Sequence, residues 1–481
     1  MTTNDAIWFD PAEMLVGGRW LRAEESLTLE DPSTGAPLAE VARGRAGEVD
    51  AAVAAAHEAA RGPWGRTDAT ERGRVLTRLG RLVAERVDEL ARLEALDVGK
   101  PLSQARADAV ALARYCEFYG GAADKLHGDT IPFRDGMTAL TLRQPHGVTG
   151  HIVPWNYPMQ IVGRSVGAAL AAGNACVLKP AEEACLTALA FARLAEAAGL
   201  PPGALNVVPG TGAEAGAALA GHPGVHHLSF TGSVATGAAV QAAAAANVVP
   251  VTLELGGKSP QVVFADADLD AALPFLVGAG VQNAGQTCSA ASRILVERSR
   301  LPEVAHAMAA RHRALRVGRA LDDLDLGPLI SARQKGIVEG FLARAEGLER
   351  LAEGRIETDA AGHYVAPVLL AGEDPAHPLA QQEIFGPVQV ILPFDDEAEA
   401  VALANGTDYG LVAGVWTRDG ARQMRMARDL RAGQVFVNDY GAGGGVELPF
   451  GGVGRSGHGR EKGFEALMGF TTLKTVVLRH G

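Results

Sequence analysis

The chain has 481 residues, of which 47% are hydrophobic and 21% charged, and its formal net charge is -12. At about 150 residues per domain, this length predicts two to four lobes, and the composition excludes an intrinsically disordered chain. The negative charge disfavours contact with a phosphate backbone, so we expect no nucleic-acid partner.

The N-terminal residues and the apolar runs bear on localisation. The first residues carry Asp5, Asp10 and Glu13 and lack the basic region and apolar run that a secretory signal needs. No stretch reaches the roughly 20 apolar residues of a membrane helix. Four cysteines without a CxxC pair are too few for a disulfide framework, and we expect no metal site. The sequence therefore predicts a cytoplasmic protein without a membrane partner.

In chain order, the first 30 residues are expected to form irregular or hairpin structure, and DPSTG at 31–35 indicates a turn. Apolar residues at three- and four-residue spacings from 46 to about 96 then predict two or three helices. Beyond residue 145, strands are expected at HGVTGHIVP, ACVLKP, LNVVPG, HHLSFTG and VTLELGG, with helices through 160–172, 183–198, 212–221 and 233–245. Because helical crossovers join parallel strands, this alternation predicts an open doubly wound α/β sheet of the kind that binds a dinucleotide.

The alternation restarts after Gly257, where adjacent glycines can bend the chain. A second α/β sheet is expected, with strands at QVVFADA, SRILVE, VQVILPF, GVWT and QVFVN and helices through 268–283 and 301–314. Residues 120–145 and 470–478 are interpreted as strands that belong to neither sheet. Exposed strand edges pair readily with another subunit. We therefore expect two doubly wound α/β domains and a small β-strand arm in a homodimer or homotetramer.

Cys288 is the cysteine best suited to reaction. Its neighbours in VQNAGQTCSAASR are small or polar and predict an open turn, whereas the other cysteines are expected to be small buried hydrophobes. A nucleophilic thiol must ionise, which requires a helix N-terminus or a base nearby. Glu254, a carboxylate inside the apolar segment LELGGK, is a candidate base with a raised pKa. The alternative for Glu254 is a buried salt bridge with Lys258 or another cation.

Three further candidate sites follow predicted strands. Asn156, between two prolines, can donate to an oxyanion or stabilise a turn. Lys179 and Glu182 in KPAE can hold ribose hydroxyls or cap the next helix. Gly232 and Ser233 end a strand and open a helix, where amide groups and the helix dipole favour an anion. A plain N-cap is the alternative for Ser233.

Together these segments resemble the aldehyde dehydrogenase superfamily nearly from end to end. VPWNYP, KPAE, FTGS, LELGGKSP, GQTCSAASR and EIFGP occur in the family's order and approximate spacing, between VGGRW and DPSTG near the start and PFGGVGRSGHGREKG near the end. The resemblance implies an NAD-dependent oxidoreductase with a cofactor domain, a catalytic domain and a strand arm. The expected boundaries are 1–122 and 146–256 with 447–467 for the NAD-binding domain, 257–446 for the catalytic domain, and 123–145 and 468–481 for the oligomerisation arm.

By this resemblance, Cys288 is the nucleophile, Glu254 is the general base, and Asn156 is the oxyanion donor together with the Cys288 backbone amide. The implied cofactor-binding residues are Lys179 and Glu182 at the adenosine ribose, Gly232 and Ser233 near the pyrophosphate, Glu383 and Phe385 at the nicotinamide end, and Trp155 beside the cofactor. The implied reaction is attack of the thiolate on an aldehyde, hydride transfer, and hydrolysis of the resulting thioester by water that Glu254 activates.

Two other functions stay open. One class of the superfamily releases the thioester to coenzyme A, and its members typically lack the general-base carboxylate, so Glu254 argues against that class. The other is a non-catalytic derivative of the fold, which would have no reason to keep a nucleophile, a base and an oxyanion donor together.

The expected cofactor and the expected substrate class each depend on one charged residue. Glu182 would repel the 2′-phosphate of NADP, so NAD is expected, with NADP as the weaker alternative. Arg164 stands where many relatives have an aromatic residue, and in this it resembles semialdehyde dehydrogenases. A guanidinium there can bind a distal carboxylate of the substrate. The alternative is that Arg164 pairs with a nearby acid and only lines the tunnel wall.

Overall fold

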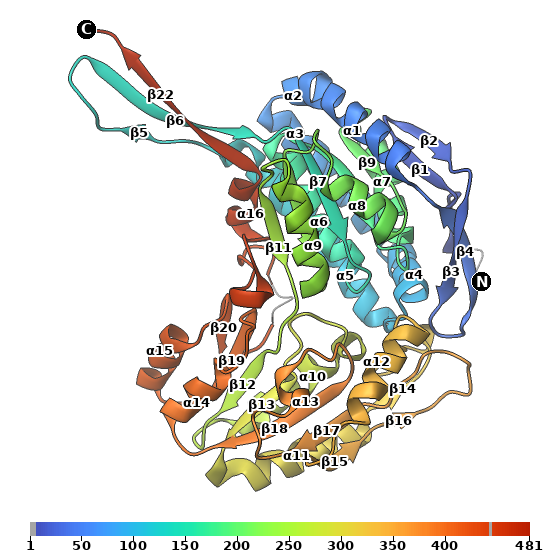
Figure 1. Cartoon of the computed structure of the whole chain (residues 1–481), viewed down its shortest axis with the longest axis vertical. Helices are drawn as coiled ribbons and strands as arrows, with labels where there is room; N and C mark the ends of the chain where they lie inside the picture. Colours follow the sequence, from blue (N-terminus) through green and yellow to red (C-terminus); the bar gives the residue numbers. More distant parts are fainter. Residues whose placement is uncertain (1–5, 442–444) are drawn as a thin grey trace.

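A computed structural model describes residues 6–441 and 445–481 of the chain. Residues 1–5, in the N-terminal segment on which the expected localisation depends, and residues 442–444, in the second expected domain, lie outside this description. The described chain forms two lobes, each around its own β-sheet, and a narrow strand arm that projects from one of them (Figure 1). The fold is therefore two α/β units with a strand arm, as the sequence predicted.

The first sheet is parallel in its centre and antiparallel at both edges. All six residues of its central strand β8 are buried, which suits an apolar strand covered by helices on both faces. The strands in spatial order are β2 (Arg19–Arg22), β1 (Glu13–Val16), β9 (Leu205–Val207), β8 (Ala175–Pro180), β7 (Val148–Val153), β10 (His227–Thr231), β11 (Val251–Glu254) and β21 (Gly457–His458).

The helices of this lobe differ from the prediction at several points. They are α1 (Ala46–Arg61), α2 (Pro63–Arg66), α3 (Ala69–Glu85), α4 (Val87–Val98), α5 (Leu102–Ala122), α6 (Pro158–Ala172), α7 (Leu186–Ala197), α8 (Ala217–Ala220), α9 (Val234–Ala245) and α16 (Gly463–Gly469). The run from 46 to 96 holds four helices rather than two or three, because Pro63 and the N-cap Asp68 start new ones. The helix predicted through 212–221 is a π-helical turn at 212–216 followed by the short α8.

The second sheet is parallel except for its edge strand β15. Its strands in order are β15 (Glu349–Glu353), β17 (Val368–Ala371), β18 (Val388–Phe394), β13 (Arg293–Glu297), β12 (Pro260–Val263), β19 (Val412–Trp416) and β20 (Gln434–Val437). The helices of this lobe are α10 (Leu269–Val281), α11 (Leu301–Ala314), α12 (Ala332–Leu342), α13 (Pro378–Gln381), α14 (Glu397–Ala404) and α15 (Gly420–Asp429).

Two small strand pairs lie outside both sheets: β3 (Ser26–Asp31) with β4 (Ala36–Ala42), and β14 (Arg316–Val317) with β16 (Arg355–Ile356). Within the described ranges, no helix is long and apolar enough to cross a membrane.

The arm joins two segments that are far apart in the sequence. β6 (Met137–Pro145) pairs antiparallel with β22 (Thr471–Arg479) along its whole length, and β5 (Thr130–Ile131) adds a short third strand. Figure 1 shows these strands extending away from both lobes, with the C-terminus at the far end. The expectation that strand structure begins at 120 is wrong, because 120–122 still belong to α5. The exact domain boundaries remain a prediction.

The arm leads to a prediction about assembly. Leu473, Val477 and Leu478 are each at least half exposed on β22, and apolar strand surface of this kind favours pairing between chains. Removal of residues 470–481 is therefore expected to convert a homo-oligomer into monomers or aggregates, measured by sedimentation velocity. Removal of 480–481 alone leaves β22 intact and is the matched control. An oligomer of unchanged size and thermal stability after the longer truncation would contradict the assignment.

Candidate active site

A cavity of about 500 Å³ lies where the carboxyl ends of β7, β10 and β11 meet loops of the second sheet. Open α/β sheets place their ligands at this edge. Helix α12 contributes further lining residues, among them Gln334. The cavity brings together most of the residues singled out from the sequence: Trp155, Asn156, Arg164, Gly232, Ser233, Glu254, Cys288, Glu383 and Phe385. Lys179 and Glu182 are not among its lining residues.

The turn that carries Cys288 follows a strained backbone segment. Asn283 and Ala284 both have left-handed conformations, with φ of 50° and 54°, and Gly285 follows with φ of 74°. Non-glycine residues rarely adopt this region, and such strain often accompanies functional sites. A Cβ on Gly285 would lie 2.1 Å from the carbonyl oxygen of Gly386, so only glycine allows the two loops to approach this closely. The thiol is therefore held on a tightly packed turn.

Asn156 connects the end of β7 to that turn. Its Nδ2 donates to the carbonyl oxygen of Gln286 at 3.0 Å, and its own carbonyl accepts from Asn283 Nδ2 at 3.0 Å. The amide group thus bonds across to the segment before Cys288 and does not stabilise a local turn. An N–H donor at this position is suited to a negative oxygen that develops beside the thiol.

The Cys288 thiol lies in an environment that opposes its ionisation. Burial raises the pKa of Cys288 to about 12, and the nearby carboxyls of Glu383 and Glu254 act in the same direction. The Arg164 guanidinium and the Lys462 ammonium lower the same pKa in part. Since only the thiolate is strongly nucleophilic, the site needs a base that takes the thiol proton.

Glu254 is the carboxylate placed to act as that base. It is 1% exposed at the end of β11, and neither carboxyl oxygen has a hydrogen-bond partner within residues 6–441 and 445–481. Burial raises the pKa of Glu254 well above its usual range, and the neighbouring carboxyl of Glu461 adds to this shift. No salt bridge to Lys258 forms among the described residues, so that alternative for Glu254 is wrong. A buried carboxyl without a partner is costly, which favours a chemical role.

Arg164 lies on α6, which begins at Pro158, and its guanidinium forms an ion pair with the buried carboxylate of Glu461. The guanidinium also lies over the ring of Phe450, 5.0 Å from the centroid. The alternative that Arg164 pairs with a nearby acid is thus observed. Arg164 nevertheless lines the cavity, and its Nη2 has no hydrogen-bond partner in the part of the chain that is described.

Glu383 and Phe385 line the cavity, and Glu383 lies beside the segment that follows β11. The rings of Phe385 and Trp155 meet edge to face with centroids 5.3 Å apart. Glu383 Oε1 accepts from the Gly257 amide at 3.1 Å, and a Cβ on Gly256 would lie 2.0 Å from Oε2 of the same carboxylate. Burial raises the pKa of Glu383 to about 7, while the Gly257 hydrogen bond and the Lys258 ammonium oppose the shift.

Lys179 and Glu182 form a separate polar pair at the end of β8. Lys179 Nζ donates to Glu182 Oε2 at 2.8 Å, and Glu182 Oε1 accepts from the Gly212 amide at 3.2 Å. Helix α7 starts later, at Leu186, so the pair does not cap it. Burial raises the pKa of Glu182, but the Lys179 ammonium and these hydrogen bonds outweigh it, so the pKa lies below its usual value. Glu182 is therefore an ionised acceptor at neutral pH.

Ser233 caps α9, since its hydroxyl accepts from the Thr236 amide at 3.3 Å. The N-cap alternative is thus observed, and Ser233 and Gly232 also line the cavity. A Cβ on Gly232 would lie 2.6 Å from the ring of Phe230, so a side chain there would displace that ring. Ser233 and Thr236 place the first turn of α9 at the cavity, and the amide groups at a helix N-terminus suit an anion.

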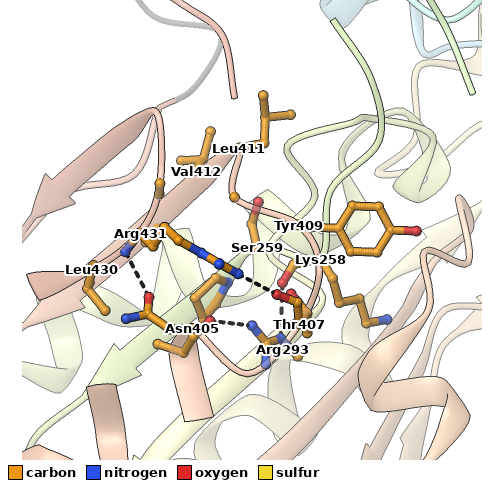
Figure 2. A pocket seen from close by; sticks show the side chains of 15 residues that line it. Lys258, Ser259, Arg293, Asn405, Thr407, Tyr409, Leu411, Val412, Leu430 and Arg431 are labelled. Carbon is orange, nitrogen blue, oxygen red and sulfur yellow. Dashed lines mark hydrogen bonds between the residues drawn. The ribbon is translucent and has the colours of Figure 1, made fainter. Parts of the chain in front are cut away.

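A second, much smaller cavity of about 10 Å³ lies behind the site at the start of β12 (Figure 2). Arg293 fills its floor and donates to the carbonyl oxygens of Lys258, Leu403 and Ala404 at 2.8 to 3.0 Å. Figure 2 shows the Lys258 ammonium pointing away from this guanidinium. The volume suits about one water molecule. The described residues also hold no group of three His, Cys, Asp or Glu side chains placed to bind a metal ion.

Sequence reasoning missed several residues that line or support the site. Glu461, which pairs with Arg164, and Phe450 lie in the segment PFGGVGRSGHGREKG. The sequence analysis used this segment only as evidence of the family resemblance and assigned no role to either residue. Tyr157 follows Asn156 directly and lines the same cavity. The signal for Glu461 was a carboxylate in a glycine-rich segment, but nothing in the sequence indicates that this segment packs against α6.

Comparison with known proteins gives consistent matches along the chain. The profile of the aldehyde dehydrogenase family matches residues 20–476. A hydroxyisobutyraldehyde dehydrogenase of Mycolicibacterium austroafricanum is 41% identical over 475 residues, which cover 97% of this chain and 93% of that protein.

Solved structures agree in fold over almost the full length. A protein of Burkholderia cenocepacia classed as an aldehyde dehydrogenase is 64% identical with a TM-score of 0.97, covering 98% of this chain and 100% of that one. The NAD+ complex of an aldehyde dehydrogenase from Bacillus cereus is 37% identical with a TM-score of 0.97, covering 100% of this chain and 99% of that one. A betaine aldehyde dehydrogenase of Staphylococcus aureus in complex with NAD+ is 32% identical with a TM-score of 0.96, covering 99% and 96%.

Proposed function

The chain belongs to the aldehyde dehydrogenase family, whose activity is aldehyde oxidation, and on this premise we propose that it oxidises an aldehyde to the carboxylic acid with NAD+ through a thioester on Cys288. The observation that supports this most is the convergence of three groups on one cavity. Cys288, Glu254 and Asn156 come from different segments and all line it. A nucleophile, a buried base and an oxyanion donor in one cavity are the parts that acyl chemistry needs.

The proposed mechanism assigns one task to each residue. Glu254 takes the proton of the Cys288 thiol, directly or through water, and the thiolate attacks the aldehyde carbon. The Asn156 amide and the Cys288 backbone amide hold the oxyanion of the thiohemiacetal. The nicotinamide ring of bound NAD+ supplies the hydride acceptor. Loss of the hydride from the thiohemiacetal leaves a thioester on Cys288. Glu254, once it has passed the thiol proton to solvent, takes a proton from water, and the hydroxide attacks the thioester carbon and releases the acid and the Cys288 thiolate.

The residues of the site fit a dinucleotide. The Lys179–Glu182 pair supplies hydrogen-bond partners for ribose hydroxyls, and the amides at the start of α9 suit the pyrophosphate. Trp155, Glu383 and Phe385 line the part of the cavity assigned to the nicotinamide end by resemblance. Relatives solved as NAD+ complexes support the same cofactor for this chain.

Glu182 gives a prediction about cofactor preference. Its ionised carboxylate accepts from a 2′-hydroxyl and repels a 2′-phosphate, so the wild type is expected to prefer NAD+ over NADP+. Glu182→Ser removes the repulsion of the 2′-phosphate. The ratio of kcat/KM with NAD+ to kcat/KM with NADP+ should therefore fall by about tenfold, which corresponds to the loss of one charge interaction. Glu183→Ser, next in the chain, is the matched control. An unchanged ratio in Glu182→Ser would mean that Glu182 does not contact the ribose.

A direct assay separates the proposal from the other functions. Formation of NADH with short aldehydes in the absence of coenzyme A is expected, and free acid should appear in equal amount. A requirement for coenzyme A would indicate an acylating enzyme. No NADH with any aldehyde of a broad panel would favour a non-catalytic derivative.

The substrate is proposed to be a semialdehyde that carries a carboxylate. Arg164 lines the cavity, and its buried Nη2 has no hydrogen-bond partner within the described segments. A guanidinium edge of this kind can bind a carboxylate at the far end of the substrate. The ion pair with Glu461 orients the guanidinium but also offsets its charge, which reduces the expected preference.

Paired substrates test this assignment. Succinic semialdehyde is expected to have a higher kcat/KM than butanal, the neutral aldehyde with the same number of carbons, by about tenfold, the effect of one charge-assisted contact. Arg164→Leu should abolish that ratio. Because the variant also removes the partner of Glu461, both rates will fall, and only the ratio within each protein is compared. Equal rates for the two aldehydes in the wild type would contradict the proposal.

A further inference from the structure

Lys462 is a buried and strained residue at the wall of the active-site cavity, and the proposed mechanism does not use it. It is 1% exposed and lines the cavity together with Arg164 and Phe450. Its backbone has φ of 58° and ψ of 173°, a combination that almost only glycine adopts. A lysine held in this conformation costs stability, and such strain is often kept where a side chain has a function.

The backbone on both sides of Lys462 is fixed by hydrogen bonds. The Glu461 amide donates to the Phe450 carbonyl oxygen at 2.8 Å, and the Phe450 amide donates to the Glu461 carbonyl oxygen at 2.7 Å. The Gly463 amide donates to the Val446 carbonyl oxygen at 2.8 Å. These bonds hold the strained conformation and keep the side chain of Lys462 at the cavity.

Two cations lie over the same aromatic ring at this end of the cavity. The Lys462 ammonium is 5.1 Å from the centroid of the Phe450 ring, and the Arg164 guanidinium is 5.0 Å from it. Both distances are within the range of a cation–π interaction. The charge of Arg164 is offset by its ion pair with Glu461, whose Oε1 also accepts from Ser229 at 2.8 Å. Lys462 therefore adds a second positive charge beside a pair that is already neutral.

The surroundings of Lys462 favour a bound anion. Burial lowers the pKa of Lys462 to about 7, and the Arg164 guanidinium acts in the same direction. An anionic group bound beside the two cations would offset both effects and keep the ammonium charged. An ammonium has three N–H donors, so Lys462 can bind such a group and also keep a contact within the protein.

We propose that Lys462 is a substrate-binding residue that holds, together with Arg164, the distal carboxylate of a semialdehyde. The proposal rests on the proposed function, in which an aldehyde that carries a carboxylate reacts with Cys288. Arg164 alone has its charge offset by Glu461, whereas Lys462 supplies a charge that this pair does not offset. The two donors together can bind a carboxylate through charge-assisted hydrogen bonds.

Binding to the Cys288→Ala protein tests this contact without turnover. With NAD+ present, succinic semialdehyde is expected to bind about tenfold more tightly than butanal, measured by isothermal titration calorimetry. Lys462→Met keeps an unbranched side chain without the charge, and it should lower this ratio of dissociation constants about fivefold. Lys462→Arg keeps the charge at the same strained position and is the matched control, which should retain most of the ratio.

Thermal unfolding tests the strain separately. Lys462→Gly and Lys462→Ala both remove the ammonium, but only glycine fits the backbone, so the glycine variant should have the higher Tm by about 2 °C or more. Val248 has φ of 57°, is 89% exposed and lies outside the cavity lining. Val248→Gly should likewise melt above Val248→Ala, and neither change should alter the ratio of dissociation constants.

The outcomes separate this proposal from the proposed function. An unchanged ratio of dissociation constants in Lys462→Met overturns the role of Lys462 and leaves a semialdehyde substrate standing. Equal affinity of the Cys288→Ala protein for the two aldehydes overturns the carboxylate contact itself. A Tm of Lys462→Gly no higher than that of Lys462→Ala removes the strain from which the proposal starts. If the wild type oxidises no aldehyde, the proposed function fails, but the binding result still decides the role of Lys462.

Discussion

Replacement of Cys288 by alanine is expected to lower NADH formation by about 10⁴-fold or more, the scale of loss when a covalent nucleophile is removed. Esterase activity on an activated ester should be lost with it, because both reactions pass through an acyl group on the same sulfur. Steady-state rates with a short aldehyde measure the first effect and release of 4-nitrophenol the second. The change from thiol to methyl is small and lies on a partly exposed turn, so folding should be retained.

A second cysteine gives the control for this loss. Cys116 on α5 is fully buried, and burial raises its pKa to about 12, so it is not a competing nucleophile. Cys116→Ala is expected to cost some thermal stability, because it leaves a small cavity, while kcat stays near that of the wild type. Substantial activity in Cys288→Ala would contradict the assignment of the nucleophile.

Glu254→Gln is expected to lower steady-state kcat by about 10² to 10⁴-fold, the usual contribution of a general base. One burst of NADH per active site should remain, because hydride transfer precedes the step in which water attacks the thioester. Rapid mixing with excess aldehyde and NAD+ measures the burst. Because Glu254 also takes the proton of the Cys288 thiol in the proposed mechanism, the burst should be slower than in the wild type, but its amplitude should be kept. Absence of any burst would place the essential role of Glu254 before hydride transfer.

The pH dependence follows from the same carboxyl. Burial raises the pKa of Glu254, and the base acts only in its ionised form. The wild-type kcat should therefore fall as pH decreases through this raised pKa and should be highest on the alkaline side. In Glu254→Gln this acidic limb is expected to disappear from the residual rate. If the wild type and Glu254→Gln both lose activity at the same acidic pH, that pH dependence belongs to a group other than Glu254.

The sequence predicted the strands of both sheets well where their pattern was local. Runs such as ACVLKP and SRILVE are apolar, β-branched and bounded by turn residues, and they correspond to β8 and β13. Helix α5 was missed, because Gly99, in a left-handed conformation, and Pro101 end the periodic run of α4. The arm was recognised as strands outside both sheets, but its pairing joins segments from opposite ends of the chain.

Individual site residues could be predicted because their motifs are long and their order is specific. Their environment could not, since it depends on contacts between distant segments. The alternative of a salt bridge between Glu254 and Lys258 is wrong, because the side chain of Lys258 does not reach that carboxylate. The ion pair of Arg164 with Glu461 and the contact of Lys100 with Tyr157 form only when the two parts of each pair fold together.

The most direct test of the thioester mechanism is the mass of Glu254→Gln after brief exposure to aldehyde and NAD+. The proposed mechanism predicts that the protein gains the mass of one acyl group and that peptide mapping places it on Cys288. The same treatment of a protein that carries both Glu254→Gln and Cys288→Ala should leave the mass unchanged. An NADH burst without any acyl adduct on Cys288 would contradict the covalent mechanism.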